Sequence, residues 1–150
     1  METSTILLIV VLLSIAVGFG IAIVIVRGGR GRAQTRLGEV PGEVTRTSAA
    51  TSMGIESLGT KQPRGTGTLV LTDQELAFAQ WRPEALIRIP RMAIRTVDTT
   101  RDHLDKSMST DLLRVRWAVD GGDDCVAFFV RDLDLWLGDL GGVRTPPPEV

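Results

Sequence analysis

The stretch that decides the fold runs Leu112-Leu-Arg-Val-Arg-Trp-Ala-Val119, Asp120-Gly-Gly-Asp123, Asp124, Cys125-Val-Ala-Phe-Phe-Val130. In its first part, large apolar side chains alternate with charged or small ones, which is typical of a β-strand with one buried face. Asp-Gly-Gly-Asp is a turn sequence that joins antiparallel strands. The last part is apolar on both faces, which favours a buried return strand. The stretch therefore predicts an antiparallel hairpin.

The chain upstream repeats this pattern of short apolar stretches between turn residues. Residues 72–75 indicate a tight connection between two strands, and Pro90 marks a strand end or edge because proline cannot donate to a ladder. Residues 101–110 are polar and predict a loop. The sequence thus predicts about seven short antiparallel strands, at residues 44–57, 67–72, 75–81, 85–89, 94–99, 112–119 and 125–130.

One amphipathic helix is expected after the last strand. Leu133, Trp136, Leu137 and Leu140 recur at helical spacing, Asp132 is a candidate N-cap, and the glycine at position 141 supplies a stop signal. A single helix that follows an antiparallel sheet can cover an open end of a barrel or sandwich, which would otherwise expose its core.

The N-terminus carries a different signal, because residues 5–26 form a run of 22 residues without a charge. As a helix this run would be about 33 Å long, enough to span a hydrocarbon core of about 30 Å. A cleaved signal peptide is the alternative, and it fits less well because residues 1–4 contain no Lys or Arg and the run exceeds a usual signal segment. The sequence predicts a single transmembrane helix.

Basic residues directly after this run predict its orientation. Four arginines follow it, and Glu2 is the only charged residue before it; the four are Arg27, Arg30, Arg32 and Arg36. Since basic flanks stay in the cytoplasm, we expect residues 1–4 outside and the rest of the chain on the cytoplasmic side of the cell (inner) membrane. The same cations can also attract anionic headgroups, although topology alone explains them.

Small residues on the apolar run allow a further contact. Ser14, Gly18 and Ala22 recur every four residues, so one helix face permits close approach of a second helix and predicts a homodimer as one alternative. Small residues are also common in membrane helices that do not pair. Residues 27–43 are rich in Gly and charge and predict a flexible linker, and residues 141–150 predict a Pro-rich extended tail.

Residues of the predicted sheet resemble a known family. The pattern Gly67-x-Leu-x-Leu71-Thr-x-x-x-Leu76-x-Phe78, followed by Ile89-Pro90, Ile94 and Val97, is similar to pleckstrin-homology-like (PH-like) domains of the GRAM and bacterial type. Three further segments, Gly54-Ile-Glu-Ser57, Arg64-Gly-Thr-Gly67 and His103-Leu-x-Lys106, resemble bacterial single-pass membrane proteins that carry such a domain. The resemblance covers residues 44–140. It implies a partly open barrel capped by a C-terminal helix, and a role in binding rather than catalysis.

Charge is divided along the chain, although the whole carries a formal net charge of −1. Residues 61–101 contain seven basic and four acidic side chains, whereas residues 102–139 contain nine acidic and four basic ones. A positive face toward a protein partner or anionic headgroups is one interpretation, and ion pairing with the later carboxylates is the other. Nucleic acid is not an expected partner. The candidate face comprises Lys61, Arg64, Arg82, Arg88, Arg91 and Arg95.

The sequence contains few candidate catalytic residues. One Cys and one His exclude an internal disulfide and a His cluster for a metal, so neither a metal nor another cofactor is expected. His103 and Ser107 lie in the predicted polar loop among carboxylates, where a solvated turn explains them more simply than a triad. The sequence favours a membrane-anchored interaction module without enzymatic activity. The alternative is a β-barrel that binds a small apolar ligand.

Overall fold

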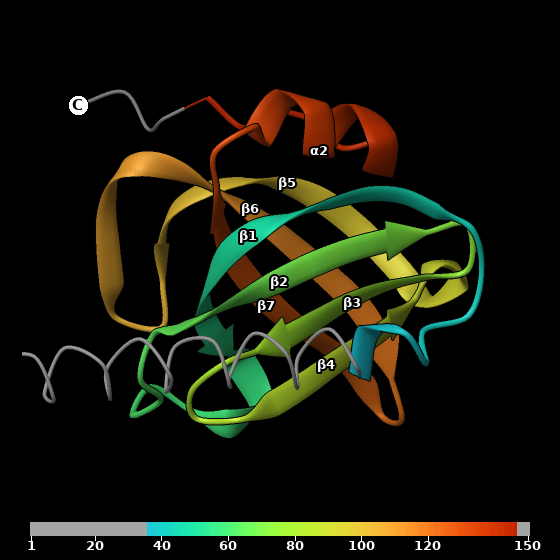
Figure 1. The fold of residues 1–150 in the computed structure, drawn as a ribbon. Helices are drawn as coiled ribbons and strands as arrows, with labels where there is room; N and C mark the ends of the chain where they lie inside the picture. The colour runs from blue at the N-terminus through green and yellow to red at the C-terminus, as the bar shows by residue number, and fades with distance from the viewer. Residues whose placement is uncertain (1–35, 147–150) are drawn as a thin grey trace, which may run out of the picture.

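A computed structural model of the chain describes residues 36–146 (Figure 1). The predicted transmembrane helix, its contact stripe Ser14, Gly18 and Ala22, and the arginines at 27, 30 and 32 lie outside the described residues. Within residues 36–146, no helix is both long and apolar enough to cross a membrane.

Within residues 36–146, seven antiparallel strands and one C-terminal helix confirm the mainly-β prediction. The order of the strands in the sheet is β4-β3-β2-β1-β7-β6-β5, so the two outer strands are β4 and β5. Two short 3-10 helices, η1 (Glu56–Leu58) and η2 (Arg91–Ala93), lie in the connections. The main elements are β1 (Val44–Ile55), β2 (Gly65–Thr72), β3 (Glu75–Gln80), β4 (Ala85–Pro90), β5 (Ile94–His103), β6 (Lys106–Val119), β7 (Gly122–Val130) and α2 (Leu133–Leu140).

Strand β1 links the two halves of the sheet. It pairs with β2 along most of its length and with β7 through its second half, where Ala50 lies opposite both Gly67 and Val130. Because β1 pairs on both sides, the two hairpin series form one curved sheet (Figure 1). Strands β4 and β5 are not hydrogen-bonded to each other, so the sheet stays open.

The core lies on the inner face of this sheet. Leu69 pairs with Phe78 and Leu71 with Leu76, which places these four side chains on one face of the sheet. The rings of Phe78 and Phe128 pack with their centroids 5.1 Å apart. Trp117, Val115 and Val126 complete this layer from the other half of the sheet. The interior is therefore filled by side chains from both hairpin series.

Helix α2 covers one end of the core, as the sequence predicted. Leu133, Trp136 and Leu137 are buried, and the Trp136 indole Nε1 donates to Ser48 Oγ at 3.1 Å. Asp132 does precede the helix, but its side chain makes no capping hydrogen bond. At the other end, Gly141 adopts a φ of 67°, in the left-handed region that glycine enters at low cost.

The chain on either side of the sheet is also bonded to it. After α2, the Val143 N–H donates to Val97 O at 3.1 Å and the Thr145 N–H to Thr99 Oγ1 at 3.0 Å, so this part of the tail follows the free side of β5. Before β1, residue 73 exchanges hydrogen bonds with Glu43. The last described residues of the predicted linker, Pro41 to Glu43, therefore lie against the β2–β3 turn.

The prediction that residues 101–110 form a polar loop is wrong. Strand β5 continues to His103 and β6 begins at Lys106, so Leu104 and Asp105 form a two-residue turn. Both have positive φ, 49° and 59°, which is unusual without glycine. The strands persist through polar sequence because a second small apolar cluster lies beneath the hairpin; it comprises Met53, Leu112 and Ala127, with Met108 and Phe129 against them.

Candidate functional site

Three cations gather where β2 begins and β3 ends. Since these strands are antiparallel neighbours, the connection before β2 and the turn after β3 lie at the same end of the sheet, at the lower left of Figure 1. Gly67 pairs with Gln80, and the Trp81 N–H donates to Thr66 O at 2.9 Å, which continues the pairing past the strand ends. We call Lys61 and Arg64 of the β1–β2 connection and Arg82 of the β3–β4 turn the basic end.

The three side chains of the basic end make no polar contact within residues 36–146. All three side chains are exposed, and within residues 36–146 no hydrogen bond or ion pair joins them to another residue. Leu58 lies in the same connection and is 67% exposed. Exposed apolar and cationic side chains together are the combination that the interfacial region of an anionic membrane favours.

Two polar side chains hold the β1–β2 connection in shape. Gln62 folds back on the connection, because its Nε2 donates to Ile55 O at 2.6 Å and to Gly59 O at 2.5 Å, while its Oε1 accepts from the Ile55 N–H. Asp124 on β7 accepts from both the N–H and the hydroxyl of Ser57, at 3.0 and 2.6 Å. Lys61 and Arg64 therefore project from a connection whose first part is held by these contacts.

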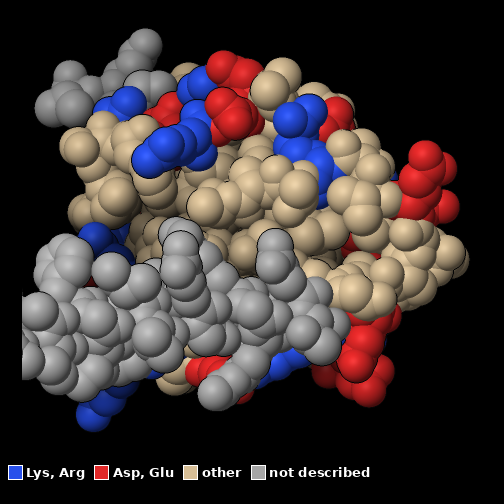
Figure 2. Space-filling view, viewed as in Figure 1, with Lys and Arg blue, Asp and Glu red and all other residues tan. Residues whose placement is uncertain are grey.

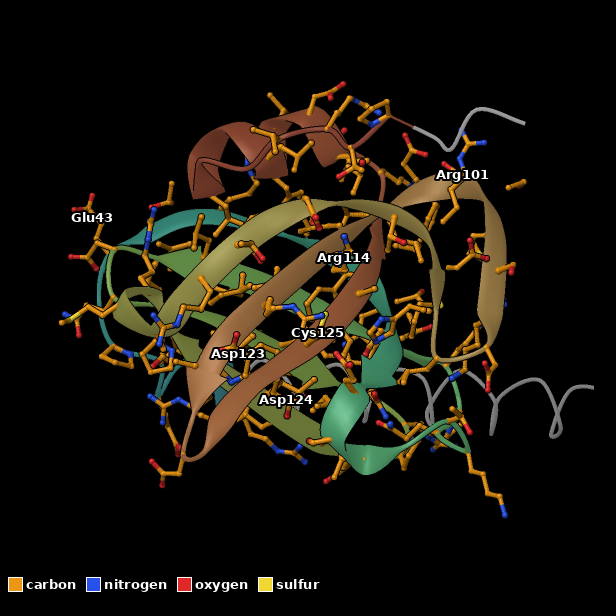
Figure 3. The ribbon with its side chains drawn as sticks, turned by 180° about the vertical axis from the view of Figure 1, so that it is seen from behind. Glu43, Arg101, Arg114, Asp123, Asp124 and Cys125 are labelled. Atoms are coloured by element: carbon orange, nitrogen blue, oxygen red, sulfur yellow. The ribbon has the colours of Figure 1, made fainter. Side chains whose placement is uncertain are left out.

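Asp123, Asp124 and Cys125 follow one another along β7 (Figure 3). The two carboxylates serve different contacts, since Asp123 lies 3.7 Å from Arg95 while Asp124 holds Ser57. Within the described residues, no group of His, Cys, Asp and Glu side chains is arranged to hold a metal ion. The Cys125 thiol is buried, as predicted, and burial raises its pKa to about 11.

The other three arginines of the predicted face have partners in the domain. Arg88 makes a two-pronged contact with Glu75 on β3, at 2.8 and 3.0 Å, and this hydrogen bond raises the pKa of Arg88. Arg91 donates to the backbone oxygens of Thr72 and Asp139. Because β4 and β5 are the two outer strands of the sheet, the structure does not gather all six predicted cations on one face.

Arg36 is the one predicted membrane-flank arginine among the described residues. Its guanidinium donates to the carboxylate of Glu84, in the turn that also carries Arg82. The start of the described chain is thereby held beside the basic end. This contact was not predicted, because no sequence pattern relates residues 48 positions apart on an irregular turn.

His103 is buried, in contrast to the expected solvated loop. Its ring Nε2 lies 2.9 Å from Gly54 O, and only 8% of the residue is exposed. The nearby Ser107 hydroxyl donates to the Asp102 carboxylate. The ring nitrogen that contacts Gly54 is therefore engaged with backbone, and burial lowers the pKa of His103.

Surface clefts lie around α2 and β5, away from the basic end. One cleft, of about 650 Å³, lies between the β5–β6 hairpin and the start of α2, and ion pairs cross its wall. Arg144 contacts Asp134 at 2.7 Å and Asp111 at 2.9 Å, and Arg101 contacts Asp111 at 2.8 Å. Sequence reasoning missed this charge network, whose Arg101 lies near the end of the described tail in Figure 3.

Comparison with known proteins identified no relative of this chain. No protein-family model matches the chain, and a search of curated proteins found no match either.

Proposed function

We propose that this protein is a membrane-anchored interaction module without catalytic activity. Its N-terminal helix spans the inner membrane of a bacterial cell, and a PH-like domain on the cytoplasmic side contacts anionic headgroups of the same bilayer. An antiparallel sheet whose two outer strands are not paired with each other, with a C-terminal helix over its core, supports the PH-like part of this proposal. The basic end supports the choice of ligand.

The observation that carries the proposal is the unpaired charge of the basic end. Lys61, Arg64 and Arg82 lie on two connections at one end of the sheet and have no partner within residues 36–146. A basic side chain close to an anionic bilayer contributes about 1 kcal/mol of attraction. Exposed Leu58 adds an apolar group that can enter the headgroup region.

Chain length supports the direction in which the domain faces. Nine residues separate the end of the apolar run from Arg36, and a linker of that length with the predicted flexibility would have a root-mean-square reach of about 15–18 Å. Arg36 contacts Glu84 beside the basic end. The tether therefore holds this end, rather than α2, near the membrane surface and raises its effective concentration there.

The alternative, a barrel that carries a small apolar ligand, finds no support in the described interior. Phe78, Trp117 and Phe128 occupy the inner face together with leucines and valines. Clefts of about 650, 460 and 220 Å³ around α2 and β5 are lined largely by charged and polar residues. We therefore retain one proposed function.

A distance measurement in nanodiscs tests the proposal on the full chain. A fluorophore on Leu58→Cys reports the distance of the basic end from a lipid-attached quencher, and a fluorophore on Leu135→Cys of α2 serves as the reference position. In discs with anionic lipid we expect strong quenching at position 58 and weak quenching at position 135. In purely zwitterionic discs the difference should shrink.

Charge variants separate the basic end from net charge. The triple variant Lys61→Gln, Arg64→Gln, Arg82→Gln should weaken the contact by about 3 kcal/mol, at about 1 kcal/mol per cation. A matched variant, Arg95→Gln, Arg101→Gln, Arg131→Gln, removes the same charge elsewhere and should keep the quenching. If both variants behave alike, headgroup contact through the basic end is refuted, and crosslinking to a membrane protein would favour a protein partner instead.

Topology has its own test. A reporter that is active only in the cytoplasm, fused after Val150, should be active in cells, and a reporter that requires export should be silent. Activity of the exported reporter alone would reverse the proposed orientation. Recovery of the intact chain in the aqueous fraction after lysis would refute the membrane anchor.

A further inference from the structure

We propose that the groove along the outer side of β5 binds an extended segment of a partner protein, and that residues 142–145 of the tail occupy the middle of this groove until such a segment displaces them. The partner segment carries one basic residue among β-branched residues and lacks proline. This inference goes beyond headgroup contact and does not rest on it, because the clefts along β5 lie away from the basic end.

The tail already lies on β5 as an incomplete added strand. The Val143 N–H donates to Val97 O at 3.1 Å. Two residues further along both segments, Thr99 Oγ1 accepts from the Thr145 N–H at 3.0 Å and donates to Thr145 O at 3.3 Å. Because residue 143 lies at residue 97 and residue 145 at residue 99, the tail runs parallel to the strand. These contacts show the direction and the spacing that a docked segment takes.

The groove is longer than the part that the tail fills. A cleft of about 460 Å³ follows β5 along residues 94–98, and a second cleft, of about 220 Å³, follows it along residues 99–102. Val143 borders the first cleft and Thr145 the second. Among the described residues, the tail makes a single backbone-to-backbone hydrogen bond with β5. An outer strand can pair with an added strand along its whole length, so this edge can hold a longer segment.

The tail is a weak occupant of the groove. Thr145 is followed in the sequence by Pro146-Pro-Pro148, and proline has no N–H to donate to a strand. The contacts of the tail are also exposed, since Val143 is 67% exposed and the Arg144 side chain 50%. Segments with few buried contacts open most readily. A segment with N–H groups where the tail has prolines can pair with more of β5, and it can therefore displace the tail.

Charge beside the groove favours a basic residue in the partner segment. Arg144 lies 2.7 Å from Asp134 and 2.9 Å from Asp111, and the Asp134 side chain is 76% exposed. When the tail leaves, both carboxylates lose this guanidinium, although Arg101 still contacts Asp111 at 2.8 Å. A Lys or Arg at the same position of the incoming segment restores the lost ion pairs, whereas a carboxylate there would be repelled.

Gly142 offers a way to release the tail without a change to its bonding groups. A Cβ built there would lie 2.7 Å from Val97 Cγ1 and 2.9 Å from Val97 O, which is too close for either atom. Gly142→Ala should therefore move the tail off β5, and hydrogen exchange of the Thr145 amide measures this. Gly138→Ala is the matched control, because its new Cβ meets nothing within 4 Å. A second variant, Val143→Pro, removes the donor to Val97 O; if neither variant exposes the Thr145 amide, the tail is not displaceable and the proposal is overturned.

Peptide binding to the full chain in detergent micelles tests the groove itself. The probe is the peptide Gly-Val-Arg-Thr-Val-Thr-Val, and the matched control is Gly-Val-Arg-Thr-Pro-Pro-Pro, which has the sequence of residues 142–148. NMR chemical shifts follow the amides of residues 94–102. We expect saturable shifts, with a dissociation constant for the probe about tenfold lower in Gly142→Ala than in the unchanged chain, where the tail competes. In Gly142→Ala the probe should also bind about tenfold more tightly than the control peptide, because it can donate further hydrogen bonds to β5.

Further arms of the experiment examine charge and the other possible occupant. A probe with Glu in place of Arg should bind several-fold more weakly, and Thr99→Val should weaken binding because it removes the hydroxyl that contacts Thr145. Absence of saturable shifts at residues 94–102 in Gly142→Ala would overturn the proposal. Equal affinity for the control peptide would also overturn it, because the tail of a second copy would then fit the groove as well as a partner. The triple variant of the basic end should bind the probe unchanged, so a failure of headgroup contact and a failure of the groove are distinguishable.

Discussion

The two ends of the sheet contain the same kinds of charged side chain but use them differently. We call α2 and the residues bonded to it the closed end. There Arg46 donates to Asp139 at 2.5 Å and Arg91 to the Asp139 carbonyl, and basic and acidic groups lie side by side in the upper part of Figure 2. At the basic end, Lys61, Arg64 and Arg82 have no partner within residues 36–146.

This difference shows that amino-acid composition does not distinguish arginines that form ion pairs within the fold from arginines that are exposed and free to bind a partner. An arginine paired with a half-buried carboxylate contributes to the stability of the fold, whereas an exposed unpaired one contributes little and stays free to bind. The contrast predicts that changes at the closed end reduce stability, and that changes at the basic end leave stability unaltered while they weaken membrane contact.

The largest effect is expected at Trp136, the fully buried indole of the closed end. Trp136→Ala removes a large core side chain and the hydrogen bond to Ser48, so it should lower the free energy of unfolding by about 3–5 kcal/mol. Denaturant unfolding of the full chain in micelles, followed by far-UV circular dichroism, measures this. Leu135→Ala on the exposed side of α2 is the control and should change little; a loss of under about 1 kcal/mol for Trp136→Ala would contradict the closing role of α2.

Gly54 is the next most sensitive position, because it shapes the connection that carries the basic end. Gly54→Ala places a Cβ at positive φ and against Gln62 and Leu104, which should cost about 1–3 kcal/mol. The same unfolding assay measures the loss. Gly122→Ala has no neighbour within 4 Å of its new Cβ and should be close to neutral; equal losses for the two variants would argue against this account of Gly54.

A matched pair of arginine variants sharpens the comparison directly. The Arg46 and Asp139 side chains are each 26% exposed, so Arg46→Gln should lower the free energy of unfolding by about 1 kcal/mol. Arg82→Gln should change it by less than about 0.5 kcal/mol, as for an exposed surface position. If the two variants lose the same stability, the distinction between paired and available arginines fails.

The smallest effect on the folded chain is expected from thiol reagents, because the buried Cys125 thiol should react slowly. With 1% exposure and a pKa of about 11, it should alkylate at neutral pH roughly 100-fold more slowly than an exposed thiol. Mass spectrometry of Leu58→Cys compares both thiols in one chain, and full labelling is expected in denaturant. Rapid labelling of Cys125 in the native chain would mean that β7 opens readily.

Local pattern was enough for most strands but not for the β5–β6 tip. Leu113, Val115 and Trp117 alternate clearly, so their strand was predictable, as was the helix that carries Trp136. Residues 101–110 have no such alternation, and their turn at Leu104 and Asp105 lacks glycine. Contacts with Gly54 and Met53, about 50 positions away, stabilise this segment, and no local pattern reports them.

The amino-acid sequence by itself determined the mainly-β fold, the closing helix and the supply of basic residues, because alternation, turn chemistry and charge are properties of neighbouring residues. Tertiary structure alone decided which cations are free, since pairing of Arg88 with Glu75 and of Arg46 with Asp139 depends on strand order and register. It also decided that His103 is buried. Both outcomes depend on long-range packing, where each partner lies many residues away along the chain.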